Sequence, residues 1–122
     1  MTKILVVDDD DDILEMMCLI LESYNLTPTC VPDGKGIREI IDDINPALIL
    51  MDIYLGKQDG RTICHSLKES AIYGHIPIIL YSAGHISSES IKASLADAFI
   101  VKPFNVQELV NQIKLRVQET IK

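Results

Sequence analysis

Short apolar runs that end at a polar residue alternate along this chain with segments of helical periodicity, and this alternation restricts the fold more than any other feature. Four of the runs are almost wholly apolar and one is more polar; in chain order they cover residues 4–7, 26–31, 47–51, 76–81 and 98–101. Consecutive apolar residues indicate a strand that is buried on both faces, whereas a strand with one exposed face alternates. The runs therefore predict a parallel sheet with helices on both sides.

The segments between the runs have the spacing of amphipathic helices. Apolar residues lie three and four positions apart in 13–21, 37–44 and 106–117, and weaker helical patterns cover 61–70 and 87–95. Five strands alternating with five helices are typical of an α/β fold, a doubly wound (βα)5 sandwich of three layers with right-handed crossovers. The chain has 122 residues without a repeat or a linker, so we expect a single domain over residues 1–122.

The charge and the cysteines argue against several classes of function. The net charge is −7, which disfavours direct binding of this chain to nucleic acid or to an anionic membrane. No segment has the apolar length of a signal-peptide core or a membrane span, so a cytoplasmic location is expected. The three cysteines, Cys18, Cys30 and Cys64, form no C-x-x-C pair. We predict buried thiols in a reducing compartment, with neither a disulfide nor a zinc site.

Polar residues with related chemistry follow four of the five runs. Asp8 and Asp9 follow the first run, Asp52 the third, Ser82 the fourth and Lys102 the fifth. In an open parallel sheet the ligand crevice lies beyond the carboxyl ends of the strands, so these side chains are expected to converge there. Crowded carboxylates need a hard divalent cation, and Mg²⁺ leaves coordination positions open for a phosphate. The set predicts phosphoryl transfer to Asp52 as a carboxylate nucleophile, with Lys102 and Ser82 contacting the phosphoryl oxygens.

Four motifs, in this order and spacing, resemble those of the receiver domain of two-component response regulators, and the resemblance covers essentially the whole chain. They are VVDD at 6–9, DIYLGKQDG at 52–60, SA at 82–83 and VKPF at 101–104. The resemblance implies a flavodoxin-like sheet with strand order 2-1-3-4-5. It also implies a phosphoacceptor signalling switch, which assists its own phosphorylation and slow dephosphorylation but does not turn over an external substrate.

The resemblance assigns roles to the residues of the metal and phosphoryl site. Asp52 is the phosphoacceptor and a metal ligand, Asp9 ligates Mg²⁺ directly, and Asp8 acts largely through water. The main-chain carbonyl of Tyr54 completes the ligands that the protein supplies. Mn²⁺ is the expected substitute for Mg²⁺.

The resemblance also implies a conformational switch. Ser82 moves toward the phosphoryl group, and Phe99 swings inward and reshapes the face formed by the fourth helix, the fifth strand and the fifth helix. The Lys102–Pro103 peptide bond is expected to be cis, which only an X-Pro bond makes inexpensive. Asp59–Gly60 is turn chemistry that precedes a helix.

Several positions depart from the common pattern of the family. Gly56 replaces a usual Pro and leaves its loop less preorganised, Leu95 stands where Gly is common, and Phe99 lacks the hydroxyl of the commoner Tyr. The resemblance implies that Tyr54 and Gly84 occupy positions at which family members vary and tune the lifetime of the phosphoryl group. We hypothesise that Tyr54 partly shields the acyl phosphate and that Gly84 leaves its other side open.

The resemblance implies partners by class. The phosphodonor is a sensor histidine kinase or a histidine phosphotransfer protein, and the output passes to a downstream effector protein or to an output domain missing from this chain. The sequence leaves open the cognate kinase, whether the chain is a stand-alone regulator or a receiver excised from a longer protein, and whether phosphorylation drives homodimerisation.

Two other interpretations of the acidic segment have testable consequences. The D-x-D pattern that begins at Asp8 resembles haloacid-dehalogenase-like phosphatases and would make Asp8 the nucleophile, although Asp12 stands where that family carries Thr or Val. Alternatively, the chain is a receiver that works as a docking module without phosphorylation. A calcium loop is excluded, because Ile13 and Leu19 stand where an EF-hand needs Gly and Glu.

Overall fold

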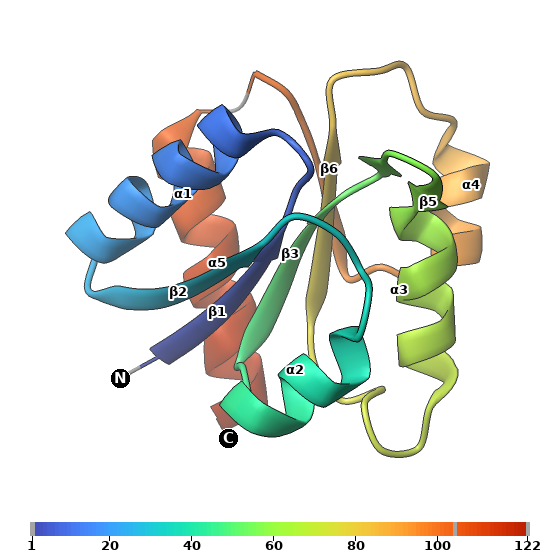
Figure 1. The fold of residues 1–122 in the computed structure, drawn as a ribbon, viewed down its shortest axis with the longest axis horizontal. Coiled ribbons are helices and arrows are strands. Elements are labelled where there is room, and N and C mark those ends of the chain that lie inside the picture. Colours follow the sequence, from blue (N-terminus) through green and yellow to red (C-terminus); the bar gives the residue numbers. More distant parts are fainter. Residues whose placement is uncertain (1, 104, 122) are drawn as a thin grey trace.

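A five-stranded parallel sheet runs through the middle of the molecule, with helices on both faces (Figure 1). The computed structural model describes residues 2–103 and 105–121. The strands of the sheet, in spatial order, are β2 (Leu26–Val31), β1 (Thr2–Val7), β3 (Leu48–Asp52), β6 (Ile78–Ser82) and β7 (Ala98–Val101). The helices are α1 (Asp11–Ser23), α2 (Ile37–Ile44), α3 (Gly60–Glu69), α4 (Ser88–Ser94) and α5 (Val106–Ile121). This architecture confirms the predicted fold and its strand order 2-1-3-4-5.

Each face of the sheet has its own apolar core. Residues from β1, β3 and β6 alternate between a core that also contains side chains of α1 and α5 and a second core that contains side chains of α2, α3 and α4. Residues 4–7 and 48–51 have no exposed surface, which explains why these runs are continuously apolar. The more polar β2 is half-buried at the edge of the sheet. Among the described residues, no helix is both long enough and apolar enough to cross a membrane.

A short hairpin lies between β3 and α3 and was not predicted. Its strands, β4 (Tyr54–Leu55) and β5 (Gln58–Asp59), pair in antiparallel fashion. Strands of two residues are too short to show a periodicity in the sequence. Gly56 begins the connecting turn with φ of 65°, a value that the ring of Pro forbids. Gly at position 56 therefore permits a hairpin turn that the usual Pro would not allow.

Leu95 ends α4 in the left-handed region, with φ of 66°. Its main-chain N–H donates to the carbonyl of Lys92 at 3.1 Å. A side chain in this conformation is strained, and Gly is the residue that usually closes a helix in this way. The turn at Leu95 therefore has a positive φ, at the cost of strain.

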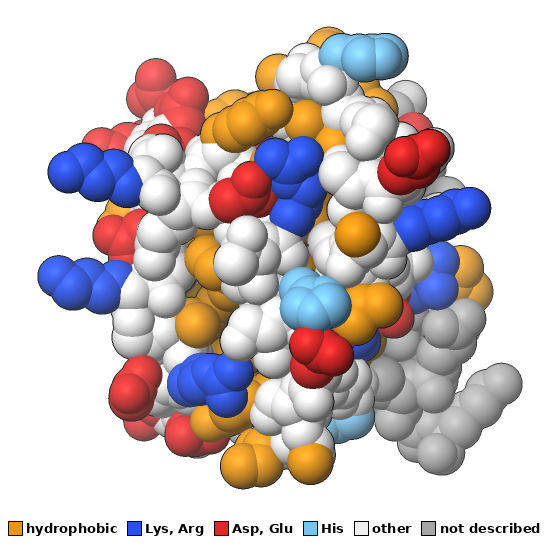
Figure 2. All heavy atoms as spheres, turned by 90° about the vertical axis from the view of Figure 1, so that its right-hand side faces the viewer, with side chains coloured by type: hydrophobic (Ala, Val, Ile, Leu, Met, Phe, Trp, Pro, Cys, Tyr) orange, Lys and Arg blue, Asp and Glu red, His pale blue; other side chains and the backbone are white. Residues whose placement is uncertain are grey.

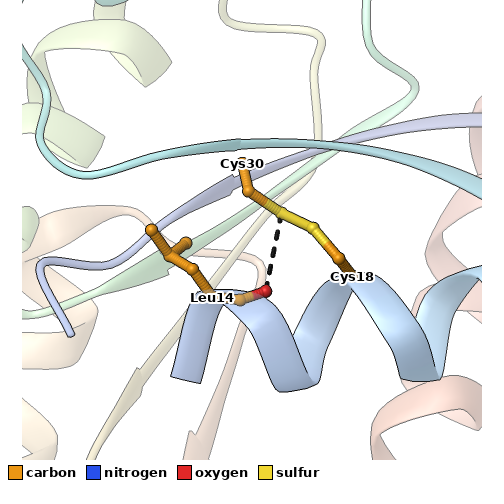
Figure 3. Close-up of a disulfide and its surroundings, with 3 residues drawn as sticks. All are labelled: Leu14, Cys18 and Cys30. Atoms are coloured by element: carbon orange, nitrogen blue, oxygen red, sulfur yellow. Dashed lines mark hydrogen bonds between the residues drawn. A yellow bond between two sulfur atoms is a disulfide. The ribbon is translucent and has the colours of Figure 1, made fainter. Parts of the chain in front are cut away.

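The prediction for two of the three cysteines was wrong. Cys18 of α1 and Cys30 of β2 form a disulfide (Figure 3) and are only half-buried. Cys64 is a free, buried thiol. The packing of α1 against β2 brings the two residues together, and their spacing of 12 positions matches no motif that a sequence search recognises. The Sγ atom of Cys30 also lies 3.8 Å from the main-chain oxygen of Leu14, to which a reduced thiol would donate.

Candidate functional site

The carboxyl ends of the strands bring the predicted side chains to one edge of the sheet. Asp8 follows β1, Asp52 and Ser82 are the last residues of β3 and β6, and Lys102 follows β7. The register pairs Asp52 with the residue before Ser82, so the ends of these strands are level. Asp8, Asp52 and Ser82 are buried, with 0%, 6% and 0% of their surface exposed, while Asp9 faces solvent.

Three carboxylates and one ammonium group form the centre of the site. One oxygen from each of Asp8, Asp9 and Asp52 lies within 4.8 Å of the others. The Nζ atom of Lys102 lies 3.4 Å from the Oδ2 atoms of both Asp8 and Asp52. An all-oxygen donor set with one solvent-facing member suits a hard cation that keeps several waters, which is the preference of Mg²⁺. The residues present therefore fit the predicted ion.

Asp52 lies in an environment that opposes its negative charge. Burial raises the pKa of the Asp52 carboxyl, and the neighbouring charge of Asp8 raises it further. The Lys102 ammonium and a main-chain hydrogen bond from Tyr54 lower it, but the net direction is upward. A bound cation would oppose both the burial and the repulsion.

Asp8 is held by donors on both of its oxygens. Its Oδ1 accepts from the main-chain N–H of Asp10 at 2.9 Å, and its Oδ2 accepts from the hydroxyl of Tyr81, also at 2.9 Å. Tyr81 was not predicted as part of the site, because within an apolar run an aromatic residue looks like core packing. The signal that could have found it is the hydroxyl, since a buried tyrosine usually has a hydrogen-bond partner. Burial, with a smaller effect of the Asp8 charge, raises the pKa of Tyr81.

Ser82, Gly84 and Tyr54 lie close to one another. The Oγ atom of Ser82 accepts from the main-chain N–H of Gly84 at 3.2 Å. A β-carbon at position 84 would lie 3.3 Å from Cε2 of Tyr54 and 3.7 Å from Oγ of Ser82. The ring of Tyr54, which is 54% exposed, therefore borders the space that a side chain at position 84 would enter.

Asp59 and Gly60 attach the start of α3 to the end of β3. The N–H of Gly60 donates to the carbonyl of Ile53 at 2.7 Å, and a β-carbon on Gly60 would collide with the main-chain oxygen of Asp52. Asp59 caps α3 by accepting from the main-chain N–H of Arg61 at 2.8 Å. The side-chain hydrogen bonds from Arg61 lower the pKa of Asp59. These contacts fix the backbone that carries Asp52.

The side of the molecule that carries α3 and α4 has mixed charge. Figure 2 shows acidic and basic side chains interspersed there. Arg61 pairs with Asp59 at 2.7 Å, and His65 lies 2.6 Å from the carboxylate of Glu69.

The remaining predicted residues lie on and after β7. Phe99 is half-buried and packs against the core that contains α2, α3 and α4. The Lys102–Pro103 peptide bond is cis. Phe104, the last residue of the VKPF motif, lies outside the described residues.

Comparison with known proteins identifies the family. The protein-family model of the response regulator receiver domain matches residues 4–114 of this chain. The chain belongs to this family. A receiver domain is the phosphoacceptor signalling domain of two-component systems, and receiver domains generally bind Mg²⁺ at an acidic pocket. In this receiver domain the cluster of Asp8, Asp9 and Asp52 could hold that ion.

Curated relatives are response regulators that are about twice as long as this receiver domain. The transcriptional regulator RpaA of Synechocystis is 29% identical over 122 residues, which cover 98% of this chain and 51% of that protein. The heme response regulator HssR of Staphylococcus epidermidis is 30% identical over 116 residues, covering 93% of this chain and 50% of that protein. This chain therefore spans about half the length of these relatives.

Solved structures agree with the family. The signal receiver domain of a histidine kinase from Syntrophus aciditrophicus has a TM-score of 0.86 at 27% identity and covers 98% of this chain and 92% of its own. The receiver domain of a Francisella response regulator has a TM-score of 0.86 at 27% identity, with 98% and 99% of the two chains covered.

Proposed function

We propose that this receiver domain accepts a phosphoryl group on Asp52 from a phosphohistidine, with Mg²⁺ held by Asp8, Asp9, Asp52 and the main-chain carbonyl of Tyr54. One observation carries the proposal. Lys102 lies at equal distances of 3.4 Å from two buried carboxylates, beside a third, at the carboxyl edge of the sheet. Such a set has more negative charge than it can neutralise, and it retains an ammonium that is not committed to one partner.

The chemistry follows from the positions of the side chains. An Asp52 oxygen forms the new bond to phosphorus while the bond between phosphorus and the donor's imidazole nitrogen breaks, and the electron pair stays on that nitrogen. When bound, Mg²⁺ supplies positive charge against the phosphoryl oxygens. Lys102 supplies a second positive charge, and the hydroxyl of Ser82 donates a hydrogen bond. Slow attack of water on phosphorus later releases inorganic phosphate and restores the Asp52 carboxylate. In this proposal the domain is a signalling acceptor that does not turn over an external substrate.

An apolar groove beside the site supports a protein as the phosphodonor. The groove has a volume of about 280 Å³ and lies between α1 and the segment that follows β7. Its lining includes the Lys102 of the site; the other lining residues are Ile13, Met16, Ile20, Pro103 and Val106. A sensor histidine kinase or histidine phosphotransfer protein that presents its phosphohistidine could place an apolar helix here, because an amphipathic helix buries its apolar face in such a groove.

The output is proposed to pass through the surface formed by α4, β7 and α5. Phe99 of β7 contacts the core behind α4, so a change in its packing would reach that surface. Val101 of β7 is 57% exposed, which leaves apolar area for a partner. The partner is a downstream effector or an output domain of the kind that the additional length of the relatives suggests.

The proposal is tested by mapping the phosphorylated residue. The chain is incubated with a small acyl phosphate and Mg²⁺, and the labelled carboxylate is identified by mass spectrometry. Label on Asp52, lost in Asp52→Asn, is the expected result. Label on Asp8 would favour the phosphatase-like alternative, and an absence of label under conditions that modify another receiver would favour an unphosphorylated docking module.

The groove is tested separately with a protein donor. Met16→Asp places a charge in the groove, and it should slow transfer from a phosphorylated phosphotransfer domain without slowing transfer from the small acyl phosphate. Glu15→Asp, on the same helix, is the matched control. Equal rates for both variants with the protein donor would exclude the groove as the docking site.

A further inference from the structure

We propose that Tyr81 is a positioning residue of the phosphoryl-transfer site, in which its hydroxyl occupies Asp8 and thereby keeps Lys102 available to the phosphoryl group. The inference rests on the proposed function of the site. Tyr81 is fully buried at the end of β6, one residue before Ser82, and it contacts two members of the site at once. Its hydroxyl donates to Oδ2 of Asp8, and its ring lies beneath the Lys102 ammonium.

The distances rank the two donors on Oδ2 of Asp8. The Tyr81 oxygen lies 2.9 Å from Oδ2, whereas the Nζ atom of Lys102 lies 3.4 Å from the same oxygen. Charge-assisted hydrogen bonds between ammonium and carboxylate usually measure about 2.7–2.9 Å. The neutral hydroxyl therefore holds the near position on Asp8, and the ammonium stays at a longer distance that it shares with Asp52.

The ring of Tyr81 supports the same arrangement. The Lys102 Nζ atom lies 4.8 Å from the ring centroid, within the range of a cation–π contact. This contact stabilises the ammonium between Asp8 and Asp52. It does not commit any N–H group of Lys102 to a carboxylate. Tyr81 thus acts on Asp8 through its hydroxyl and on Lys102 through its ring.

Loss of the hydroxyl has a definite consequence for both neighbours. A buried carboxylate that loses a donor takes another one, because an unsatisfied buried oxygen is costly. Lys102 is the nearest candidate and would move toward Asp8, away from Asp52 and from an incoming phosphoryl group. The same shift places an ammonium where it competes with a cation for Asp8, so Mg²⁺ binding and phosphorylation should weaken together.

The test compares Tyr81→Phe with a matched control. Tyr73 is also buried and its hydroxyl also donates to a carboxylate, Asp42, at 2.9 Å, but this pair lies outside the site. Tyr73→Phe therefore removes a tyrosine–carboxylate hydrogen bond of the same length, although Asp42 is exposed. Tyr81→Phe should weaken Mg²⁺ binding, measured by calorimetry without any phosphodonor, by about tenfold, which is at the lower end of the losses seen when a group behind a metal ligand is removed. Tyr73→Phe should bind Mg²⁺ as the wild type does.

A second readout separates positioning from a general loss of structure. At saturating Mg²⁺ the rate of Asp52 labelling by a small acyl phosphate should still be lower in Tyr81→Phe by roughly tenfold, because Lys102 remains displaced. In the background of Asp8→Asn, Tyr81→Phe should have no further effect on Mg²⁺ binding, since it acts through Asp8.

The outcomes are decisive for each proposal separately. Wild-type Mg²⁺ affinity and labelling rate in Tyr81→Phe, an equal loss in Tyr73→Phe, or a full tenfold loss in the Asp8→Asn background would each overturn the role of Tyr81 while Asp52 remains the acceptor. A wild-type chain that binds Mg²⁺ but is never labelled on Asp52 would overturn the proposed function, and the calorimetric comparison would still decide whether Tyr81 positions Asp8.

Discussion

A largely buried lysine lies beside aspartate at each end of the parallel strands, at the amino edge and at the carboxyl edge of the sheet, but the two arrangements differ. At the amino edge the Nζ atom of Lys68 lies 2.9 Å from Oδ2 of Asp97 and 3.1 Å from the carbonyl of Ile76. The same Asp97 oxygen accepts from the main-chain N–H of Ile78 at 2.8 Å. The ammonium and the carboxylate at this edge are committed to fixed partners that close the fold.

At the carboxyl edge, Lys102 has no carboxylate partner closer than 3.4 Å among the residues that the structure describes. Lys102 is 3.4 Å from both Asp8 and Asp52, and its side chain is 16% exposed compared with 13% for Lys68. Burial is therefore similar, and the difference lies in the number of acids around each ammonium. One acid and one base form a short pair, whereas three acids and one base leave negative charge that a cation can neutralise and an ammonium that can turn to a ligand.

The largest effect is expected from removing the Lys102 ammonium at the carboxyl edge. Lys102→Met should slow Asp52 labelling by a small acyl phosphate by roughly 10²–10³-fold, the usual cost of losing one charge-stabilising group. The measurement is the initial rate of labelling at saturating Mg²⁺. A rate within a factor of two of the wild type would remove the distinction between the two lysines.

The next effect concerns the cation. Mg²⁺ at a hundred times its dissociation constant should raise the free energy of unfolding by about 2.7 kcal/mol, because it binds only the folded site. Denaturant titrations with and without the ion measure this gain. The gain should disappear in Asp9→Asn, and a gain that persists there would place the ion elsewhere.

Breaking the ion pair at the amino edge should change the stability of the fold but not the rate of phosphorylation. Lys68→Met breaks a charge-assisted hydrogen bond to the partly exposed Asp97 and should lower the free energy of unfolding by about 2 kcal/mol. The rate of Asp52 labelling should stay at its wild-type value. A slower rate with unchanged stability would contradict the view that this pair serves the fold.

The smallest expected effect is a change in the pH dependence of the metal-free protein. Burial raises the pKa of Asp52 above its ordinary value of 3.8, so the folded state holds this proton more tightly than the unfolded state does. Stability from this group therefore falls as pH rises from that value through the raised pKa. Asp52→Asn should be more stable than the wild type at neutral pH, and the difference should vanish toward acid pH in urea titrations. An equal slope in both proteins would contradict the crowding of the carboxylates.

The side chains of the carboxyl edge could be predicted because parallel strands all end on the same side. Asp8, Asp52, Ser82 and Lys102 follow or finish apolar runs, and that property alone places them together. The fold class was predictable from the runs themselves, since runs buried on both faces require helices on each side. The strand order was predictable only from the resemblance to receiver domains.

Other features could not be read from the pattern. The hairpin of β4 and β5 is too short to have a periodicity, and the Cys18–Cys30 disulfide depends on how α1 packs on β2. Tyr81 lies inside an apolar run, where the pattern indicates burial but not the direction of a hydroxyl.

The sequence by itself determined which chemical groups stand at the carboxyl edge, because strand ends and burial follow from local runs of apolar residues. Only the tertiary structure decided which atoms meet there. The contact of Tyr81 with Asp8 spans 73 positions and that of Lys102 with Asp8 spans 94. Both join strands that are not paired, because β3 lies between β1 and β6. Such contacts are fixed by the whole sheet, which brings distant residues together in a way that no local pattern encodes.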